Sequence, residues 1–214
     1  MLSKIISEKK LIVIVREVYG EQLLKLADAL YDGGIRLIEV AFNQVDNDCL
    51  NKTTEAIFEL CKRMSGKMHV GAGTVLTTLQ VELAKKAGAE FIISPNADAN
   101  VIRRTKELEM LSIAGAMTPS EMVFAHNSGA DFVKVFPADK LGADYIKAIS
   151  IPLGHIKLIA TAGIREDNVL EFLQSGCAAV GVSARLADKV EIEKGNFSEF
   201  TSRAKQFCKL IETL

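Results

Sequence analysis

Short apolar runs rich in β-branched residues recur along the whole chain. Runs of about four to eight such residues, bounded by turn residues, are typical of buried β-strands. We therefore predict eight strands. They cover residues 11–15 (LIVIV), 37–42 (LIEVAF), 69–73 (HVGAG), 91–95 (FIISP), 111–116 (LSIAGA), 132–137 (FVKVFP), 156–161 (IKLIAT) and 178–183 (AAVGVS).

Helical stretches lie between the predicted strands, and a last amphipathic segment from Phe197 to Leu210 is predicted as the eighth helix. In one of these stretches the apolar side chains form a single stripe, as on an amphipathic helix: Leu23, Leu24, Ala27, Leu30 and Tyr31. Four helices are expected to end at a glycine directly before a strand, because glycine readily adopts the left-handed turn that stops a helix: Gly34, Gly88, Gly129 and Gly176.

The alternation of strands and helices predicts a parallel sheet, because parallel strands need a crossover connection and helices supply it. Eight such units close into a barrel. We therefore predict an α/β fold, a single (β/α)8 barrel that spans residues 1–214 without a linker or a break in composition. An open doubly wound sheet is the alternative, but the G-x-G-x-x-G of a dinucleotide site does not follow the first strand.

Composition narrows the class of ligand. The 214 residues are 49% hydrophobic and 25% charged, with a formal net charge of -1, which gives no reason to expect a nucleic-acid or membrane partner. No apolar run reaches the ~18 residues of a membrane span, and the N-terminus does not resemble a signal peptide. The 4 cysteines and 3 histidines are scattered without metal-ligand spacing. We expect a cytoplasmic protein that acts on a small metabolite with no metal or organic cofactor.

A lysine interrupts one of the apolar strands. Lys134 shares a face with Phe132 and Phe136, while Val133 and Val135 point the other way. Burial there favours the neutral amine, which attacks ketones to form an imine. The structural alternatives are that Lys134 only pairs with a carboxylate, or that it points outward between helices.

A glutamate interrupts another strand. Glu39 shares a face with Leu37 and the small Ala41, which leaves space toward the C-terminal end of the strand, where barrel active sites lie. A carboxyl group near Lys134, working through water, can move the protons that imine formation requires. The alternative is a structural salt bridge between the two residues without catalysis.

Several short segments resemble the motifs of a known family. IEV (38–40), GAGTV (71–75), ISPN (93–96), VKVFPA (133–138) and TAGI (161–164) occur in the order, and at about the spacing, found in the 2-keto-3-deoxy-6-phosphogluconate/4-hydroxy-2-oxoglutarate aldolases. The resemblance covers essentially the whole chain, and the combined pattern is far more specific than GAGTV or SPN alone.

The resemblance implies a class I aldolase of sugar-acid catabolism, as in the Entner–Doudoroff pathway, that works as a homotrimer. It makes Lys134 the Schiff-base lysine and Glu39 the acid/base. Thr74 and Thr161 are also strand-end hydroxyls that could instead cap the next helix. The resemblance places a further group of residues around the keto acid: Thr74, Pro95, Phe136 and Thr161. Asn96 is a further candidate for substrate binding, at a position expected to influence which aldehyde is released.

The carboxylate of a keto acid needs a cation, and Arg16, at the end of the first strand, can form a bidentate clamp. The alternative is a solvated strand-end arginine. One branch of the family carries an arginine shortly after the glutamate, where this chain has Asn43. Other members resemble this chain and have an arginine that closes the first strand.

A phosphate site is expected in the loops after the seventh and eighth strands, where backbone N–H groups are available; simple tight turns are the alternative. Family members commonly carry Gly-Gly in both loops, and the extra methyl groups of this chain are expected to bear on which substrate it prefers. The residues concerned are Ala162, Gly163, Gly181, Val182 and Ser183.

The predicted reaction is cleavage of a 4-hydroxy-2-keto acid, of the 2-keto-3-deoxy-6-phosphogluconate or 4-hydroxy-2-oxoglutarate type, to pyruvate and an aldehyde such as glyceraldehyde 3-phosphate. The galactonate-type phospho sugar acid is an alternative substrate. Two other functions remain open: a metal-free phosphosugar isomerase or epimerase, in which Lys134 only stabilises an enolate, and a catalytically silent barrel that senses a keto acid.

Overall fold

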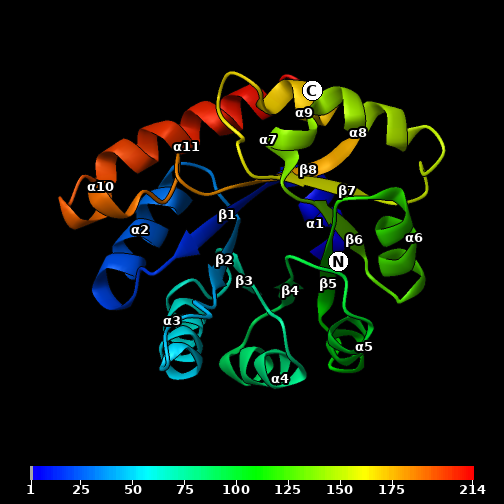
Figure 1. Cartoon of the computed structure of the whole chain (residues 1–214). Coiled ribbons are helices and arrows are strands. Elements are labelled where there is room, and N and C mark those ends of the chain that lie inside the picture. The colour runs from blue at the N-terminus through cyan, green and yellow to red at the C-terminus, as the bar shows by residue number, and fades with distance from the viewer. Residues whose placement is uncertain (1) are drawn as a thin grey trace.

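A computed structural model describes residues 2–214, and in it eight parallel strands form a closed barrel in the order β1 to β8 (Figure 1). β8 pairs with β1, so the sheet has no free edge. This confirms the predicted (β/α)8 fold. The strands are β1 (Leu11–Arg16), β2 (Leu37–Ala41), β3 (His69–Gly73), β4 (Phe91–Ile93), β5 (Leu111–Ala116), β6 (Phe132–Val135), β7 (Leu158–Thr161) and β8 (Cys177–Val182).

Helices surround the barrel (Figure 1). The segment predicted as the eighth helix is α11, the eleventh among residues 2–214, because a helix precedes β1 and two helices each follow β6 and β8. The helices are α1 (Leu2–Lys9), α2 (Gly20–Asp32), α3 (Cys49–Arg63), α4 (Thr78–Ala87), α5 (Ala99–Glu107), α6 (Pro119–Asn127), α7 (Ala138–Leu141), α8 (Ala143–Ser150), α9 (Val169–Gln174), α10 (Lys189–Glu193) and α11 (Phe197–Ile211).

The glycines predicted to stop helices have left-handed backbones, with φ of +100° at Gly34, +99° at Gly88, +104° at Gly129 and +109° at Gly176. Two strands were predicted to extend two residues beyond their observed ends. β4 ends at Ile93 and β6 at Val135. Prolines follow two residues later in both cases, and proline has no N–H with which to continue the ladder.

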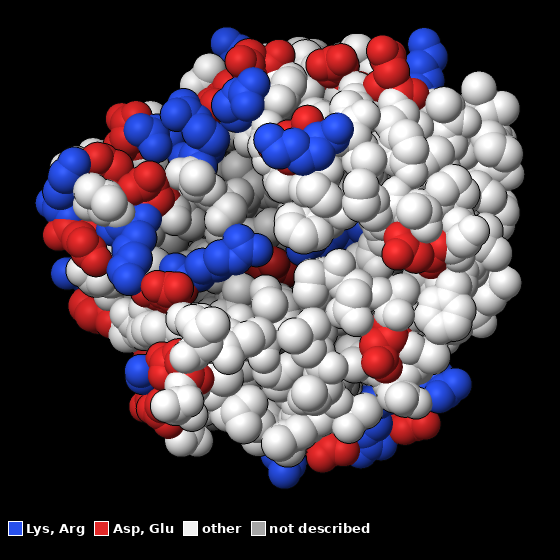
Figure 2. Space-filling view, viewed as in Figure 1, with Lys and Arg blue, Asp and Glu red and all other residues white. Residues whose placement is uncertain are grey.

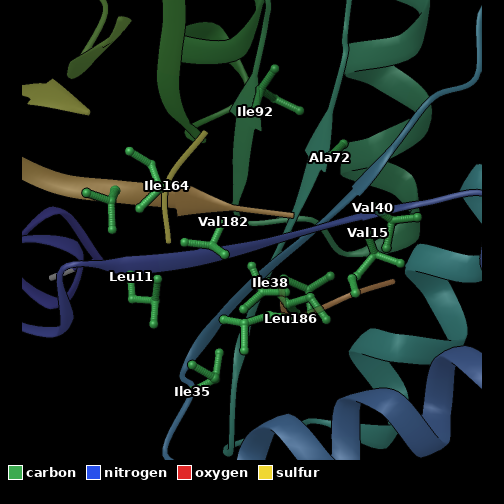
Figure 3. Close-up of a cluster of buried hydrophobic side chains, with 14 of the residues drawn as sticks. Leu11, Val15, Ile35, Ile38, Val40, Ala72, Ile92, Ile164, Val182 and Leu186 are labelled. Carbon is green, nitrogen blue, oxygen red and sulfur yellow. The ribbon is translucent and has the colours of Figure 1, made fainter. Parts of the chain in front are cut away.

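Alternation along the strands separates two cores. Outward side chains pack against the helices, and Figure 3 shows part of this outer core, with Val15, Val40 and Val182 among its labelled residues. Inward side chains fill the barrel, where Ile6 from α1 closes the end at which the strands begin. The inner core contains Ile12, Leu37, Phe91, Ile93, Leu111, Ile113, Phe132, Ile159 and Ala179. It fills one half of the barrel and leaves the end at which the strands finish for polar groups.

Candidate active site

Lys134 and Glu39 lie inside the barrel, one layer above the apolar filling. They come from β6 and β2, which face each other across the ring of eight strands. Their residues are 3% and 1% exposed, respectively. Val133 and Val135 belong to the outer core, as predicted, so the lysine points inward and not between helices. Its Nζ lies 5.0 Å from the centroid of the Phe136 ring.

The carboxyl group of Glu39 has no hydrogen-bond partner in the part of the chain that the structure describes. Within residues 2–214, neither of its oxygens accepts a hydrogen bond, so Glu39 and Lys134 do not form the structural salt bridge that was the alternative. Gly73 makes the space for this group, because a Cβ at that position would lie 2.7 Å from Glu39 Oε1. A buried polar group without a partner is costly in a folded protein. This carboxyl group is therefore available to a molecule that enters the barrel.

Burial moves the pKa values of both groups toward the neutral forms. Desolvation raises the pKa of Glu39 above its ordinary value, and the charges of Lys134 and Arg16 oppose that rise. Desolvation lowers the pKa of Lys134, Glu39 opposes the change, and Arg16 adds to it. A lysine with a lowered pKa is a better nucleophile near neutral pH, and a carboxyl group with a raised pKa is a better proton donor there.

A cavity of about 330 Å³ opens above Lys134 at the C-terminal ends of the strands. Figure 2 shows the hollow in the middle of this face, with basic and acidic atoms at its floor. The cavity is lined by Arg16, Glu17, Ala41, Phe42, Asn43, Gln44, Val45, Thr74, Pro95, Lys134 and Phe136. Four of the residues predicted to surround a substrate, besides the lysine, are thus brought together.

A second cavity of about 290 Å³ lies beside the first and shares Arg16 and Phe136 with it. It is lined by Ile14, Arg16, Phe136, Thr161, Ala162, Gly163, Ile164, Arg165, Gly181, Ser183, Ala184 and Arg185. The two loops predicted to hold a phosphate therefore face one space. We call the first cavity, which contains Lys134, the lysine-side cavity, and the second the loop-side cavity. Together they suit an elongated substrate with two different ends.

Two predicted residues line neither of these two cavities. Asn96 is exposed and lines a third cavity, of about 380 Å³, which shares Pro95 and Phe136 with the first. The side chain of Val182 is 1% exposed and lies in the outer core (Figure 3), because it has the opposite strand parity to Gly181. Its methyl groups therefore do not crowd the loop-side cavity.

Thr74 and Thr161 do not cap the helices that follow them. The N-cap residues of α4 and α9 are Thr77 and Asn168. Thr74 has an unusual positive φ of +54° for a β-branched residue, and Gln44 Nε2 donates to its carbonyl oxygen at 2.7 Å. This arrangement holds the loop after β3 against the lysine-side cavity.

Close packing leaves no room for a side chain at either loop glycine. A Cβ at Gly181 would lie 2.8 Å from Thr161 Oγ1, and one at Gly163 would overlap the side chain of Asp139. Ala162 has a φ of +85°, a backbone conformation that glycine adopts more readily. The backbone of the Ala162–Gly163 loop thus has a glycine-like shape despite the alanine.

The cavities also contain residues that the sequence did not single out: Glu17, Gln44, Arg165 and Arg185. All four lie in loops beyond strand ends, where no periodic pattern distinguishes them from solvated residues. Within residues 2–214, no group of three or more histidine, cysteine or acidic side chains is placed to hold a metal ion. None of the helices described is long and apolar enough to span a bilayer.

Comparisons with known proteins agree on one family. The sequence model of the 2-keto-3-deoxy-6-phosphogluconate (KDPG) and 4-hydroxy-2-oxoglutarate (KHG) aldolases matches residues 2–202. The chain is 30% identical to the 2-dehydro-3-deoxy-6-phosphogalactonate aldolase of Escherichia coli K12 over 82% of its length and 83% of the relative's. It is 29% identical to the 2-dehydro-3-deoxy-phosphogluconate aldolase of Treponema pallidum, over 89% of this chain and 88% of that one.

Solved structures extend the likeness to the whole barrel. A native KDPGal structure superposes with a TM-score of 0.84 at 28% identity, over 95% of this chain and 96% of that one. The KDPG aldolase of Legionella pneumophila, with pyruvate captured as a covalent carbinolamine, gives a TM-score of 0.83 at 26% identity, over 96% and 97% of the two chains.

Proposed function

The chain belongs to the KDPG and KHG aldolase family, and from that premise we propose that it cleaves a 4-hydroxy-2-keto acid through a Schiff base on Lys134. The observation that carries this proposal is the buried Lys134 at the first cavity, with a pKa lowered by desolvation, together with the buried carboxyl group of Glu39, which has no hydrogen-bond partner and whose charge acts on the lysine. The captured pyruvate in the Legionella pneumophila relative supports it. Aldolases are lyases, and no metal or organic cofactor is required for this chemistry.

In the proposed first step, the neutral amine of Lys134 attacks the C2 ketone and forms a carbinolamine. Glu39, acting through a water molecule, removes a proton from nitrogen and then delivers one to the departing hydroxyl, which leaves as water. The product is a cationic imine. Phe136 and the apolar barrel interior exclude other water from it.

The imine then withdraws electrons from the C3–C4 bond. Water activated by Glu39 accepts the C4 hydroxyl proton, the C3–C4 bond breaks, and the aldehyde leaves. The electron pair of the broken bond moves toward the imine nitrogen and forms the enamine. Protonation of the enamine at C3 and hydrolysis of the imine release pyruvate and free Lys134. We assign Arg16, Thr74 and Pro95 to the keto-acid end, because they line the same cavity as the lysine.

We propose that the substrate carries a phosphate, as in 2-keto-3-deoxy-6-phosphogluconate or its galactonate epimer. The loop-side cavity supports this, because Ala162, Gly163, Gly181 and Ser183 line a space large enough for an anion, which backbone N–H groups of the two loops can bind. We assign Thr161 to the junction between the two ends. A panel of both epimers and 4-hydroxy-2-oxoglutarate, compared by kcat/KM, identifies the preferred substrate.

The mechanism is tested by incubating the protein with pyruvate and borohydride and mapping the modified residue by mass spectrometry. We expect a reduced three-carbon adduct on Lys134 and none in Lys134→Arg, whose guanidinium forms no imine. Lys157→Arg, a change outside the two cavities, should keep the adduct. Cleavage without any adduct would instead support an isomerase-like enolate mechanism and would refute the Schiff base.

We also propose a homotrimer. Met117 and Phe124 are 47% and 48% exposed beside the mouth of the barrel, and the part of the face around α6 shows few charged residues (Figure 2). Exposed apolar surface of this kind marks contacts between subunits. Light scattering should give three times the chain mass, and Phe124→Lys should give monomers. A monomeric wild-type protein at micromolar concentration would contradict the proposal.

We place the protein in the cytoplasm, in catabolism of sugar acids such as the Entner–Doudoroff pathway. The scattered, unpaired cysteines support a reducing compartment. Cell fractionation with an antibody against the chain tests the location. Growth of a deletion strain on gluconate and galactonate tests the pathway.

A further inference from the structure

Three guanidinium groups surround the loop-side cavity, and none of its lining residues is acidic. Arg16 closes β1, Arg165 follows β7, and Arg185 follows β8. Such a lining attracts anions, and guanidinium groups bind phosphate with two parallel hydrogen bonds. The three arginines differ, however, in what already holds them.

Arg185 is engaged within the protein. Its Nε and Nη2 donate to the carboxylate of Glu166 at 3.0 and 2.9 Å, and the side chain of Glu166 is only 14% exposed. This two-bond pair ties the loop after β8 to the loop after β7. Because Glu166 already neutralises its charge, Arg185 holds the two loops together and offers little net charge to a ligand.

Arg16 lines both cavities and is placed toward the lysine. It lines the first cavity together with Lys134, and its positive charge lowers the pKa values of both Glu39 and Lys134, so we assign it to the keto-acid end of the site. If Arg16 binds the C1 carboxylate, as proposed, one cation is already assigned. A phosphate at the other end of the substrate then needs a different one.

Arg165 is the arginine that remains available. Its side chain is 54% exposed, and its Nε lies 3.2 Å from Asp167 Oδ1, whose side chain is 72% exposed. Its Nη1 donates to the carbonyl oxygen of Gly163 at 3.5 Å. Exposed ion pairs of this kind are weak, so the guanidinium can turn toward a bound anion at little cost.

We propose that Arg165 binds the phosphate monoester of the substrate and thereby determines its preference for a phosphorylated aldehyde end. The proposal rests on the proposed function for the location of that end. In this proposal the phosphate is bound by the charged side chain of Arg165 in addition to the backbone N–H groups of the two loops. Asp167 competes with the ligand for the same guanidinium group.

The test is binding of glycerol 3-phosphate, a phosphate monoester without a ketone, measured by calorimetry on the wild type and three variants. Arg165→Ala should raise the Kd about tenfold or more, the loss expected when a hydrogen-bonded charge partner is removed. Asp167→Asn should lower the Kd about two- to threefold, because it removes the competing carboxylate. Arg103→Ala, an exposed arginine on α5, should leave the Kd unchanged.

Kinetics with one phosphorylated and one unphosphorylated keto acid complete the test. Arg165→Ala should raise KM for the phosphorylated substrate and leave KM for the other unchanged. An unchanged Kd in Arg165→Ala, or no binding of glycerol 3-phosphate by the wild type, overturns the inference. Failure of the Schiff-base mechanism is separately visible, because it would abolish the borohydride adduct on Lys134 without altering the Kd values.

Discussion

The carboxyl group of Glu39 occupies the space that a side chain at Gly73 would need. A Cβ at position 73 would lie 2.7 Å from Glu39 Oε1 and 2.8 Å from its carboxyl carbon. Gly73 is paired in register with Ala41, so two small residues border the glutamate on the side of the cavity. The position of the candidate acid/base thus depends on the absence of a side chain on the neighbouring strand.

Gly73→Ala should therefore impair catalysis more than folding. The new methyl group displaces the carboxyl group by a fraction of a bond length or more, and a misplacement of about 1 Å can cost roughly 100-fold in rate. We expect kcat to fall about 10- to 100-fold. Circular dichroism should show an intact fold. Wild-type kcat in this variant would exclude any need for the observed position of Glu39.

Glu39→Gln should be less active and more stable. Loss of a general acid/base costs about 10²- to 10⁴-fold in kcat. Because burial raises the pKa of Glu39, the folded state holds its proton more tightly than the unfolded state does. The wild type therefore loses stability as the pH rises from the ordinary glutamate pKa through the raised value. An uncharged amide removes that loss.

Thermal melts of the wild type and Glu39→Gln, compared from pH 4 to pH 8, check this prediction. The two melting temperatures should be closest at low pH and should separate by about 2–4 °C per kcal/mol as the pH rises. A variant that becomes less stable than the wild type with rising pH would show that the charged carboxylate stabilises the fold.

The barrel itself was predictable from the sequence. Eight apolar runs alternating with helices closed by glycines specify strands, crossovers and their order, because burial on both faces leaves a continuous apolar signal. Lys134 and Glu39 stand out for the same reason: each is a charge in a strand that is otherwise apolar. Both residues occupy strand positions whose side chains point inward, so both lie inside the barrel.

Loop residues were not predictable in this way. The methyl groups of Val182 were expected to affect the anion site, but one step of strand parity places them in the outer core. Arg165 and Gln44 lie in loops, which leave no periodic trace in the sequence. The position of Gln44 also depends on hydrogen bonds to Thr74 and Gln80, which are distant in sequence. The helices α7 and α10, of 4 and 5 residues, are too short for a clear amphipathic pattern.

Ala162→Gly should stabilise the protein modestly. A left-handed backbone costs an alanine about 1–2 kcal/mol, and glycine gives back roughly 0.4–1 kcal/mol through its more flexible unfolded state. We expect a net gain of about 0.5–1 kcal/mol, measured by calorimetry. Ala160→Gly, a fully buried control on β7, should destabilise it. Destabilisation by both substitutions would contradict the inferred backbone strain.

Gln44→Ala should weaken binding of the keto acid. Gln44 accepts a hydrogen bond from Gln80 Nε2 at 3.1 Å and donates to the Thr74 carbonyl at 2.7 Å, which links the loops after β2 and β3. Gln44 is exposed, so its loss should change the melting temperature little. We expect KM for the keto acid to rise several-fold, because loss of one such bond costs about 1 kcal/mol. An unchanged KM with a lowered melting temperature would assign Gln44 a purely structural role.

The rate of imine formation should depend on pH through Lys134. Only the neutral amine attacks a ketone, so trapping with pyruvate and borohydride should accelerate as the pH rises and level off once the lysine is deprotonated. Since burial lowers the lysine pKa and the charge of Arg16 lowers it further, the midpoint should lie below the ordinary value of 10.5. Arg16→Gln removes the nearby positive charge and should move the midpoint to higher pH, with saturating pyruvate used to offset weaker binding. A midpoint that stays in place or moves to lower pH would show that the guanidinium does not act on the amine.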